Sequence, residues 1–147
     1  CGNHGDPIVA EDTLDVMKKK LFPLCSLITP NLEETSILSG KNSNIMKNPE
    51  DVSGIFFSLG ANAVLIKGGH ANENICKDFL IQKDHDLLVF KTERKQGATE
   101  IRGTGCRLAS AIAFFLASGI SLNQAVEKGR YYLQSFMLGK LCLQKES

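Results

Sequence analysis

The chain has 147 residues, which is ample for one hydrophobic core and leaves little for a second. Its 17 basic and 16 acidic residues nearly cancel, so no broad polyanion-binding face is expected and nucleic acid is not an expected partner. The five cysteines form no C-x-x-C pair and their number is odd, which argues against a disulfide framework and against a zinc site. Reduced thiols in the cytoplasm are the simpler expectation. No apolar run reaches the roughly 18 residues that are needed to cross a membrane.

The first third of the chain alternates helices with one short strand. Apolar residues recur every three or four positions across residues 11–22, which predicts an amphipathic helix that Pro23 helps to end. A short apolar segment at residues 27–29, bounded by Pro30, has the composition of a buried parallel strand. A brief helix over residues 32–38 is expected next.

The middle of the chain predicts one helix and three strands. Pro49 suits the first turn of a helix, and an apolar stripe extends this helix to Gly60. Residues 63–66 are uniformly apolar and predict a buried strand. Residues 75–81 and 87–90 predict two further strands joined by a turn, antiparallel at the edge of the sheet.

Two helices, over residues 107–117 and 122–143, complete the predicted elements. Strands and helices in alternation imply a parallel sheet covered on both faces, with ligands at the carboxyl ends of its strands. We therefore predict a three-layer α/β/α fold with a mostly parallel sheet.

The segment Gly103-Thr104-Gly105-Cys106 stands directly before the apolar run of residues 108–116. Its glycines allow a turn with positive φ, and the N–H groups of a helix that begins there would face a ligand, so the segment predicts an anion-binding turn feeding a buried helix. The alternative is an ordinary loop-to-helix junction without a ligand. The Walker A pattern of nucleotide-binding proteins does not occur in the sequence.

Two further motifs precede this turn. Residues 27–34 have the sequence L-I-T-P-N-L-E-E, and residues 63–70 have the sequence A-V-L-I-K-G-G-H. In order and spacing the three motifs resemble the phosphomethylpyrimidine kinases of the ribokinase-like superfamily, in which G-T-G-C opens the helix of an anion hole. The resemblance extends from about Gly5 onward. It implies a kinase that uses ATP and Mg²⁺ to phosphorylate hydroxymethylpyrimidine and then its monophosphate, in thiamine biosynthesis.

The resemblance implies catalytic roles for the anion-binding turn. Gly103, Thr104 and Gly105 are expected to bind the transferring phosphoryl group, and Cys106 to accept the proton of the substrate hydroxyl. Most of the superfamily carries aspartate at this position, whereas the pyrimidine kinases carry cysteine. N–H donors at a helix N-terminus favour a thiolate, and phosphoryl transfer needs only a modest base.

The residues that follow the two earlier strands are implied to serve the nucleotide. Glu34 is expected to help hold Mg²⁺ through water, and Asn31 to lie near the transferring phosphates. From the residues alone, the alternative is that Asn31 caps a helix and Glu34 completes a capping box. Lys67, Gly68 and Gly69 are expected to line the nucleotide phosphates, and their alternative is a simple turn at a strand end.

Two features depart from the usual pattern of the family. H-G-T-G-C-T is replaced here by R-G-T-G-C-R, which puts the guanidinium groups of Arg102 and Arg107 beside the predicted anion hole. They either contact phosphate oxygens, with Arg102 as the better candidate, or pair with acidic residues such as Glu100. Residues 92–101, which correspond to the loop that walls the adenine, also diverge, so the nucleotide preference stays open.

The resemblance further implies that residues 1–147 form the C-terminal half of a kinase domain whose N-terminal half binds the pyrimidine. We therefore expect a complementary N-terminal half, or a full-length protein that forms a homo-oligomer, and an inactive isolated chain. Two alternative functions stay open. One is a pyridoxal or pyridoxine kinase, and the other is a binding module that holds a pyrimidine or nucleotide without turnover.

Overall fold

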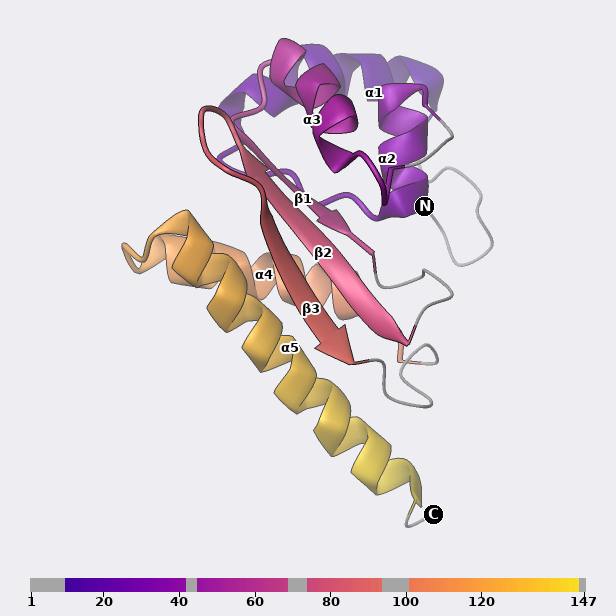
Figure 1. Cartoon of the computed structure of the whole chain (residues 1–147), viewed down its shortest axis with the longest axis vertical. Coiled ribbons are helices and arrows are strands. Elements are labelled where there is room, and N and C mark those ends of the chain that lie inside the picture. The colour runs from indigo at the N-terminus through magenta and orange to yellow at the C-terminus, as the bar shows by residue number, and fades with distance from the viewer. Residues whose placement is uncertain (1–9, 42–44, 69–73, 94–100, 146–147) are drawn as a thin grey trace. The chain divides into compact units, whose positions relative to one another are not determined.

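The structure, a computed structural model, describes residues 10–41, 45–68, 74–93 and 101–145 (Figure 1). The chain divides into two compact units, Cys1–Glu93 and Arg94–Ser147. Within the described residues, the first unit contains three α-helices, two shorter helical turns and a sheet, and the second contains two α-helices.

The helix predicted over residues 11–22 is present but changes its winding along its length. It begins as the α-helix α1 (Glu11–Val16), continues as the π-helical turn η1 (Met17–Leu21) and tightens into the 3-10 turn η2 (Phe22–Leu24). Pro23 lies in η2, where its missing N–H prevents the helical hydrogen bonds from continuing. Phe22, at the start of this turn, is buried in the core.

The two other helices of this unit begin as the sequence predicts. The side chain of Asn31 caps α2 (Leu32–Ser39), and Gly40 ends this helix in the left-handed conformation, with a φ of 70°. Pro49 occupies the first turn of α3 (Pro49–Ser58), where no N–H is needed.

Three strands form an antiparallel sheet in the order β1-β2-β3. These strands are β1 (Ala63–Lys67), β2 (Ile75–Gln82) and β3 (Leu88–Glu93). Antiparallel pairing follows from the short connections between successive strands, because a parallel pair needs a crossover of about a dozen residues or more.

Among the described residues, parallel pairing is confined to two isolated bridges. They join Ile28 to Val64 and Asn31 to Lys67. The segment predicted as a strand at residues 27–29 therefore lies beside β1 in the expected parallel direction, without forming a continuous ladder.

The core of the first unit lies between its helices and one face of the sheet. Val64 and Ile66 of β1 and Phe79 and Ile81 of β2 pack in one cluster with helical residues, among them Phe56, whose ring stacks on that of Phe22 at 6.0 Å between centroids. Leu65 and Leu80 alternate to the opposite face and are also fully buried. Burial on both faces explains why residues 63–66 are uniformly apolar.

The second unit is a pair of helices, α4 (Thr104–Ala117) and α5 (Leu122–Lys145), joined by a short connection (Figure 1). The helices approach closely where Ile112 of α4 meets Gly129 of α5, since a Cβ at Gly129 would come within 2.8 Å of the Ile112 side chain. In the part of the chain that the structure describes, no helix is long and apolar enough to cross a membrane.

Candidate functional site

The structure brings the first two motifs together at the end of β1. Asn31 bridges to Lys67, and the backbone N–H of Lys67 donates to the carbonyl oxygen of Pro30 at 2.9 Å. Two residues earlier, the N–H of Leu65 donates to the carbonyl oxygen of Ile28 at 2.8 Å. Pro30 and Asn31 of the T-P-N segment and Lys67 of β1 are therefore neighbours at one edge of the sheet, as parallel pairing requires.

Asn31 and Glu34 form a complete capping box at the start of α2. The N–H of Glu34 donates to Oδ1 of Asn31 at 2.7 Å, and the N–H of Asn31 donates to Oε2 of Glu34 at 2.8 Å. The buried Thr35 adds a hydroxyl hydrogen bond to the carbonyl oxygen of Asn31 at 2.6 Å. The capping alternative considered from the sequence is thus present, and it fixes the position of both side chains.

This arrangement is compatible with a role for Glu34 at a magnesium ion. A carboxylate offers about four lone-pair sites on two oxygens, so accepting the capping bond does not by itself prevent a carboxylate from facing a hydrated ion. Within the described ranges, no group of three or more His, Cys, Asp or Glu residues lies where it could hold a metal. Mg²⁺ retains several waters and commonly binds proteins through one or two carboxylates, so a single glutamate fits its chemistry.

The end of β1 is held by a residue that sequence reasoning missed. The N–H of Gly68 donates to Oδ1 of Asp78 at 2.9 Å, and Asp78 is only 8 % exposed. A Cβ at Gly68 would collide with the backbone carbonyl oxygen of Lys77. A carboxylate directly before the apolar run Phe79–Ile81 of β2 is the signal that could have identified Asp78. Gly69 lies outside the described residues.

In the second unit, the predicted anion-binding turn opens α4. Gly103 has a φ of 75°, and its carbonyl oxygen accepts the N–H of Arg107 at 3.1 Å. That bond is the first of the helix, so the preceding N–H groups of the turn have no acceptor within the helix. Gly105 lies inside the helix, and of the two glycines only Gly103 has the positive φ that the sequence predicts.

Cys106 is the third residue of α4 and its side chain is exposed. Among the described cysteines it differs from Cys25 and Cys76, which are half-buried. All three are free thiols. Cys106 is therefore the one exposed thiol among the described cysteines, and it lies at a helix N-terminus.

The two arginines beside the turn differ in their surroundings. Arg102 is exposed, and it precedes the turn. The guanidinium of Arg107 lies over the ring of Phe136 in α5, with 3.9 Å between its central carbon and the ring centroid. An aromatic ring is therefore a partner of Arg107, which sequence reasoning did not consider. Glu100, the suggested acidic partner, lies outside the described residues.

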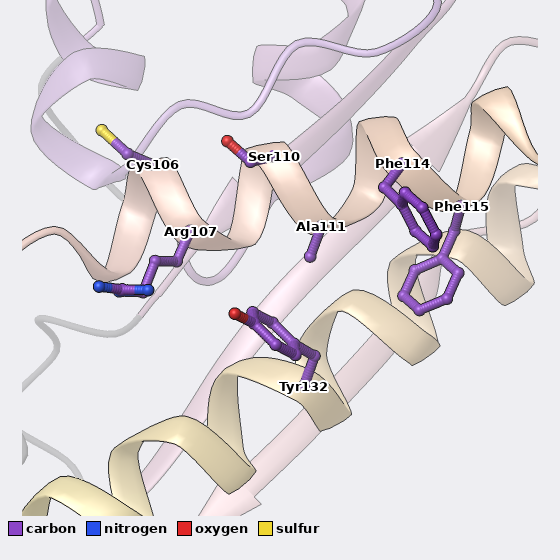
Figure 2. A pocket seen from close by; sticks show the side chains of 7 residues that line it. All are labelled: Cys106, Arg107, Ser110, Ala111, Phe114, Phe115 and Tyr132. Atoms are coloured by element: carbon purple, nitrogen blue, oxygen red, sulfur yellow. The ribbon is translucent and has the colours of Figure 1, made fainter.

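A cavity of about 510 Å³ lies within the second unit, between α4 and α5. Figure 2 shows Tyr132 extending from α5 toward α4, on the side of α4 that carries Arg107 and Ala111. The cavity is lined by Cys106, Arg107, Ser110, Ala111, Phe114, Phe115 and Tyr132.

The exposure of α4 corrects the prediction that this helix is buried. The apolar run of residues 108–116 was expected to form a buried helix, yet only Leu108 and Ile112 in it are buried. Phe114 is 65 % exposed. The run is therefore a helix with one buried stripe and an aromatic outer face beside the cavity.

The chain matches the phosphomethylpyrimidine kinase family over residues 1–147. The chain belongs to this family. One relative, the putative hydroxymethylpyrimidine/phosphomethylpyrimidine kinase 2 of Schizosaccharomyces pombe, is 34% identical over 88% of this chain and 26% of its own length. Another, the hydroxymethylpyrimidine/phosphomethylpyrimidine kinase of Rhizobium meliloti, is 32% identical over 89% of this chain and 49% of its own length.

Solved structures of similar kinases share the fold. Phosphomethylpyrimidine kinase from Clostridium difficile 630 matches with a TM-score of 0.74 and 29% identity, over 92% of this chain and 53% of its own. Pyridoxal kinase from Staphylococcus aureus in complex with AMP-PCP and pyridoxal matches with a TM-score of 0.77 and 28% identity, over 86% of this chain and 47% of its own.

These similarities confirm the family and the ribokinase-like α/β fold that the three motifs predict. The chain spans about half the length of the Rhizobium relative and of both solved structures. The roles of the individual residues stay predictions.

Proposed function

We propose that this chain supplies part of a kinase that transfers phosphate from ATP to hydroxymethylpyrimidine and then to its monophosphate, in thiamine biosynthesis. Family membership over residues 1–147 is the observation that carries the proposal. The geometry supports it, because the positive-φ turn at Gly103 opens α4 beside the exposed Cys106.

In this proposal the N-terminus of α4 stabilises the transferring phosphoryl group. Gly103, Thr104 and Gly105 offer backbone N–H groups, and the helix dipole adds positive potential at the same end. Charge on the phosphoryl oxygens is stabilised in the transition state by such fixed donors. The Cys106 thiol accepts the proton of the attacking hydroxyl, and a weak base suffices because phosphoryl transfer has a loose transition state.

The end of β1 faces the nucleotide in this proposal. ATP as the donor is supported by the Staphylococcus aureus pyridoxal kinase, whose structure contains AMP-PCP. The ammonium of Lys67 is proposed to contact a phosphate, and the N–H of the neighbouring Gly68 donates to Asp78. Asn31, held beside Lys67, is proposed to lie near the transferring phosphates, and Arg102 to contact the nucleotide.

Glu34 is proposed to help hold Mg²⁺ through water. The ion would neutralise charge on the phosphates. The capping bond to Asn31 holds the Glu34 carboxylate in place at the start of α2. We place the reaction in the cytoplasm, which the free thiols of Cys25, Cys76 and Cys106 support.

A pyridoxal kinase is the second candidate function. It is favoured by the TM-score of 0.77 to the Staphylococcus aureus pyridoxal kinase, which is slightly above the 0.74 for phosphomethylpyrimidine kinase. The name of the matched family favours the pyrimidine over pyridoxal.

A coupled assay of ADP release from the intact protein tests the proposal. Hydroxymethylpyrimidine, its monophosphate and pyridoxal are offered as acceptors, and a reaction without acceptor measures background ATP hydrolysis. We expect the highest kcat/KM with the two pyrimidines. A preference for pyridoxal would establish the second candidate, and ATP binding by calorimetry without turnover of any acceptor would indicate a binding module.

A further inference from the structure

Lys67 and Asp78 face each other across the β1–β2 pair. The register places Lys67 opposite Asp78 and Leu65 opposite Leu80. Because Val64, Ile66, Phe79 and Ile81 belong to the core on the helix face, strand alternation puts Lys67 and Asp78 together on the opposite face.

The hydrogen bonds of β1 alternate between its two neighbours. The N–H groups of Leu65 and Lys67 donate toward residues 28–30, so the N–H of Gly68 points toward β2. Continuing the register would pair Gly68 with Lys77. Instead the Gly68 N–H donates to the carboxylate of Asp78 at 2.9 Å.

The backbone of Gly68 lies directly against β2. A Cβ there would collide with the carbonyl oxygen of Lys77 and would come within 3.2 Å of the Met46 methyl. This close approach and the Asp78 hydrogen bond together fix where β1 ends and how the chain leaves it. A hydrogen bond to a buried carboxylate is stronger than one between neutral groups.

We propose that Asp78 is a positioning residue for nucleotide binding, which holds the Lys67–Gly68 strand end in the direction that the phosphates require. This inference rests on the proposed function. A carboxylate near a phosphate site repels the ligand, so Asp78 helps through geometry and not through its charge. Its bond to Gly68 supplies that geometry, because it anchors the residue after Lys67.

The first measurement is hydrogen exchange at the Gly68 amide in the intact protein. Asp78→Ala removes the acceptor, and we expect exchange to accelerate by about ten- to a hundredfold, as loss of a charged hydrogen bond implies. Asp78→Asn keeps an acceptor oxygen and should retain most of the protection. Asp86→Ala, which removes an exposed carboxylate from the β2–β3 turn, is the matched control and should leave Gly68 unchanged.

The second measurement separates positioning from general stability. In Asp78→Ala we expect KM for ATP to rise about tenfold while KM for the pyrimidine stays unchanged, whereas a merely structural role would alter both constants or neither. Asp78→Asn should restore KM for ATP to within about twofold of the wild type. Asp78→Glu moves the carboxylate by one methylene and should weaken ATP binding even if Asp78→Ala does not fold.

The outcomes distinguish this inference from the proposed function. If the wild type phosphorylates no pyrimidine, yet Asp78→Ala accelerates Gly68 exchange and weakens ATP binding by calorimetry, the role of Asp78 stands and the proposed function fails. Unchanged Gly68 exchange and unchanged ATP affinity in Asp78→Ala and Asp78→Glu would overturn the inference. It would also be overturned if Asp78→Asn weakened ATP binding as much as Asp78→Ala.

Discussion

Cys106 is the residue on which the proposed chemistry depends most directly. Its thiol is exposed at the third position of α4 and lines the cavity in this unit. We expect Cys106→Ala to lower kcat by about a hundredfold, at the low end of what a positioned proton acceptor contributes, because the base is weak. The dissociation constant for ATP should change little, since the backbone N–H groups of the turn remain. Coupled kinetics and calorimetry measure the two quantities.

The control for this substitution is Cys76→Ala, which removes a half-buried free thiol from β2. It should leave kcat within about twofold of the wild type. Cys106→Asp should retain part of the activity, because aspartate is the usual base of the superfamily. An alanine variant at position 106 with wild-type kcat would remove the thiol from the mechanism.

One substitution can separate the capping role of Glu34 from its proposed role at Mg²⁺. Glu34→Gln keeps an oxygen that can accept the Asn31 N–H, so the free energy of unfolding should change by no more than about 0.5 kcal/mol. If Glu34 holds Mg²⁺ as proposed, its lost charge should raise severalfold the Mg²⁺ concentration that gives half-maximal rate.

Glu33→Gln is the matched control, because Glu33 is an exposed acidic neighbour in the same first turn of α2. It should leave the Mg²⁺ titration unchanged. Superimposable titrations for Glu34→Gln and the wild type would show that Glu34 serves the helix alone.

Contacts between residues close in sequence could be predicted from their spacing, whereas contacts between residues far apart in sequence could not. Asn31 and Glu34 are three apart, and that spacing alone suggested the capping box that the structure shows. Asp78 is ten residues from Gly68, and only the register of β1 with β2 brings them together. A single sequence does not specify that register, so the partner of Gly68 was missed.

At the scale of elements, the start of α4 depends on the backbone conformation of Gly103. A side chain at a φ of 75° is strained, so Gly103→Ala should destabilise the protein by about 1–2 kcal/mol. The helix start would shift and its N–H groups would lose their direction, so kcat should also fall. Urea unfolding and coupled kinetics measure the two effects.

Gly119 provides a control with the same strain away from the turn. Its φ is 80°, and at both glycines the space around an added Cβ is open, so Gly119→Ala should cost a similar free energy of unfolding. We expect its kcat to remain near that of the wild type. Equal losses of kcat in both variants would mean that stability, and not the proposed anion-binding turn, explains the effect of Gly103→Ala.

The elements themselves were predicted with uneven success, for physical reasons. The helix at residues 49–60 and the strand at residues 63–66 could be predicted from proline, glycine and the pattern of apolar residues. The π-helical turn at Met17–Leu21 has no sequence signal that we recognise. The segment at residues 27–29 has the apolar composition of a strand, yet it forms only isolated bridges because Pro30 cannot donate to a ladder.

At the scale of the whole molecule, the family and fold were predictable because three motifs occur in a fixed order. The alternation of strands and helices suggested a mostly parallel sheet, whereas the described strands pair antiparallel because short connections join them. The amino-acid composition of a strand does not indicate which other strand it pairs with. The parallel direction survives in the pairing of Ile28 and Asn31 with β1.

The length of the chain relative to its family leads to the last prediction, which concerns residues 1–147 alone. They span 49% of the Rhizobium relative and 53% of the Clostridium difficile kinase. They contain the predicted phosphate-binding residues, so weak binding of ATP with Mg²⁺ is expected by calorimetry. We expect no measurable phosphorylation of hydroxymethylpyrimidine, because misplacing a bound substrate by about an ångström already costs on the order of a hundredfold in rate.

Adding the N-terminal half of the Rhizobium relative as a separate polypeptide provides the complementary test. If that half supplies a wall of the pyrimidine site, turnover should appear with the mixture and stay absent with either piece alone. The Cys106→Ala chain in the same mixture is the control, and it should give about a hundredfold less turnover. Robust turnover by residues 1–147 without any addition would show that the pyrimidine site lies within this chain.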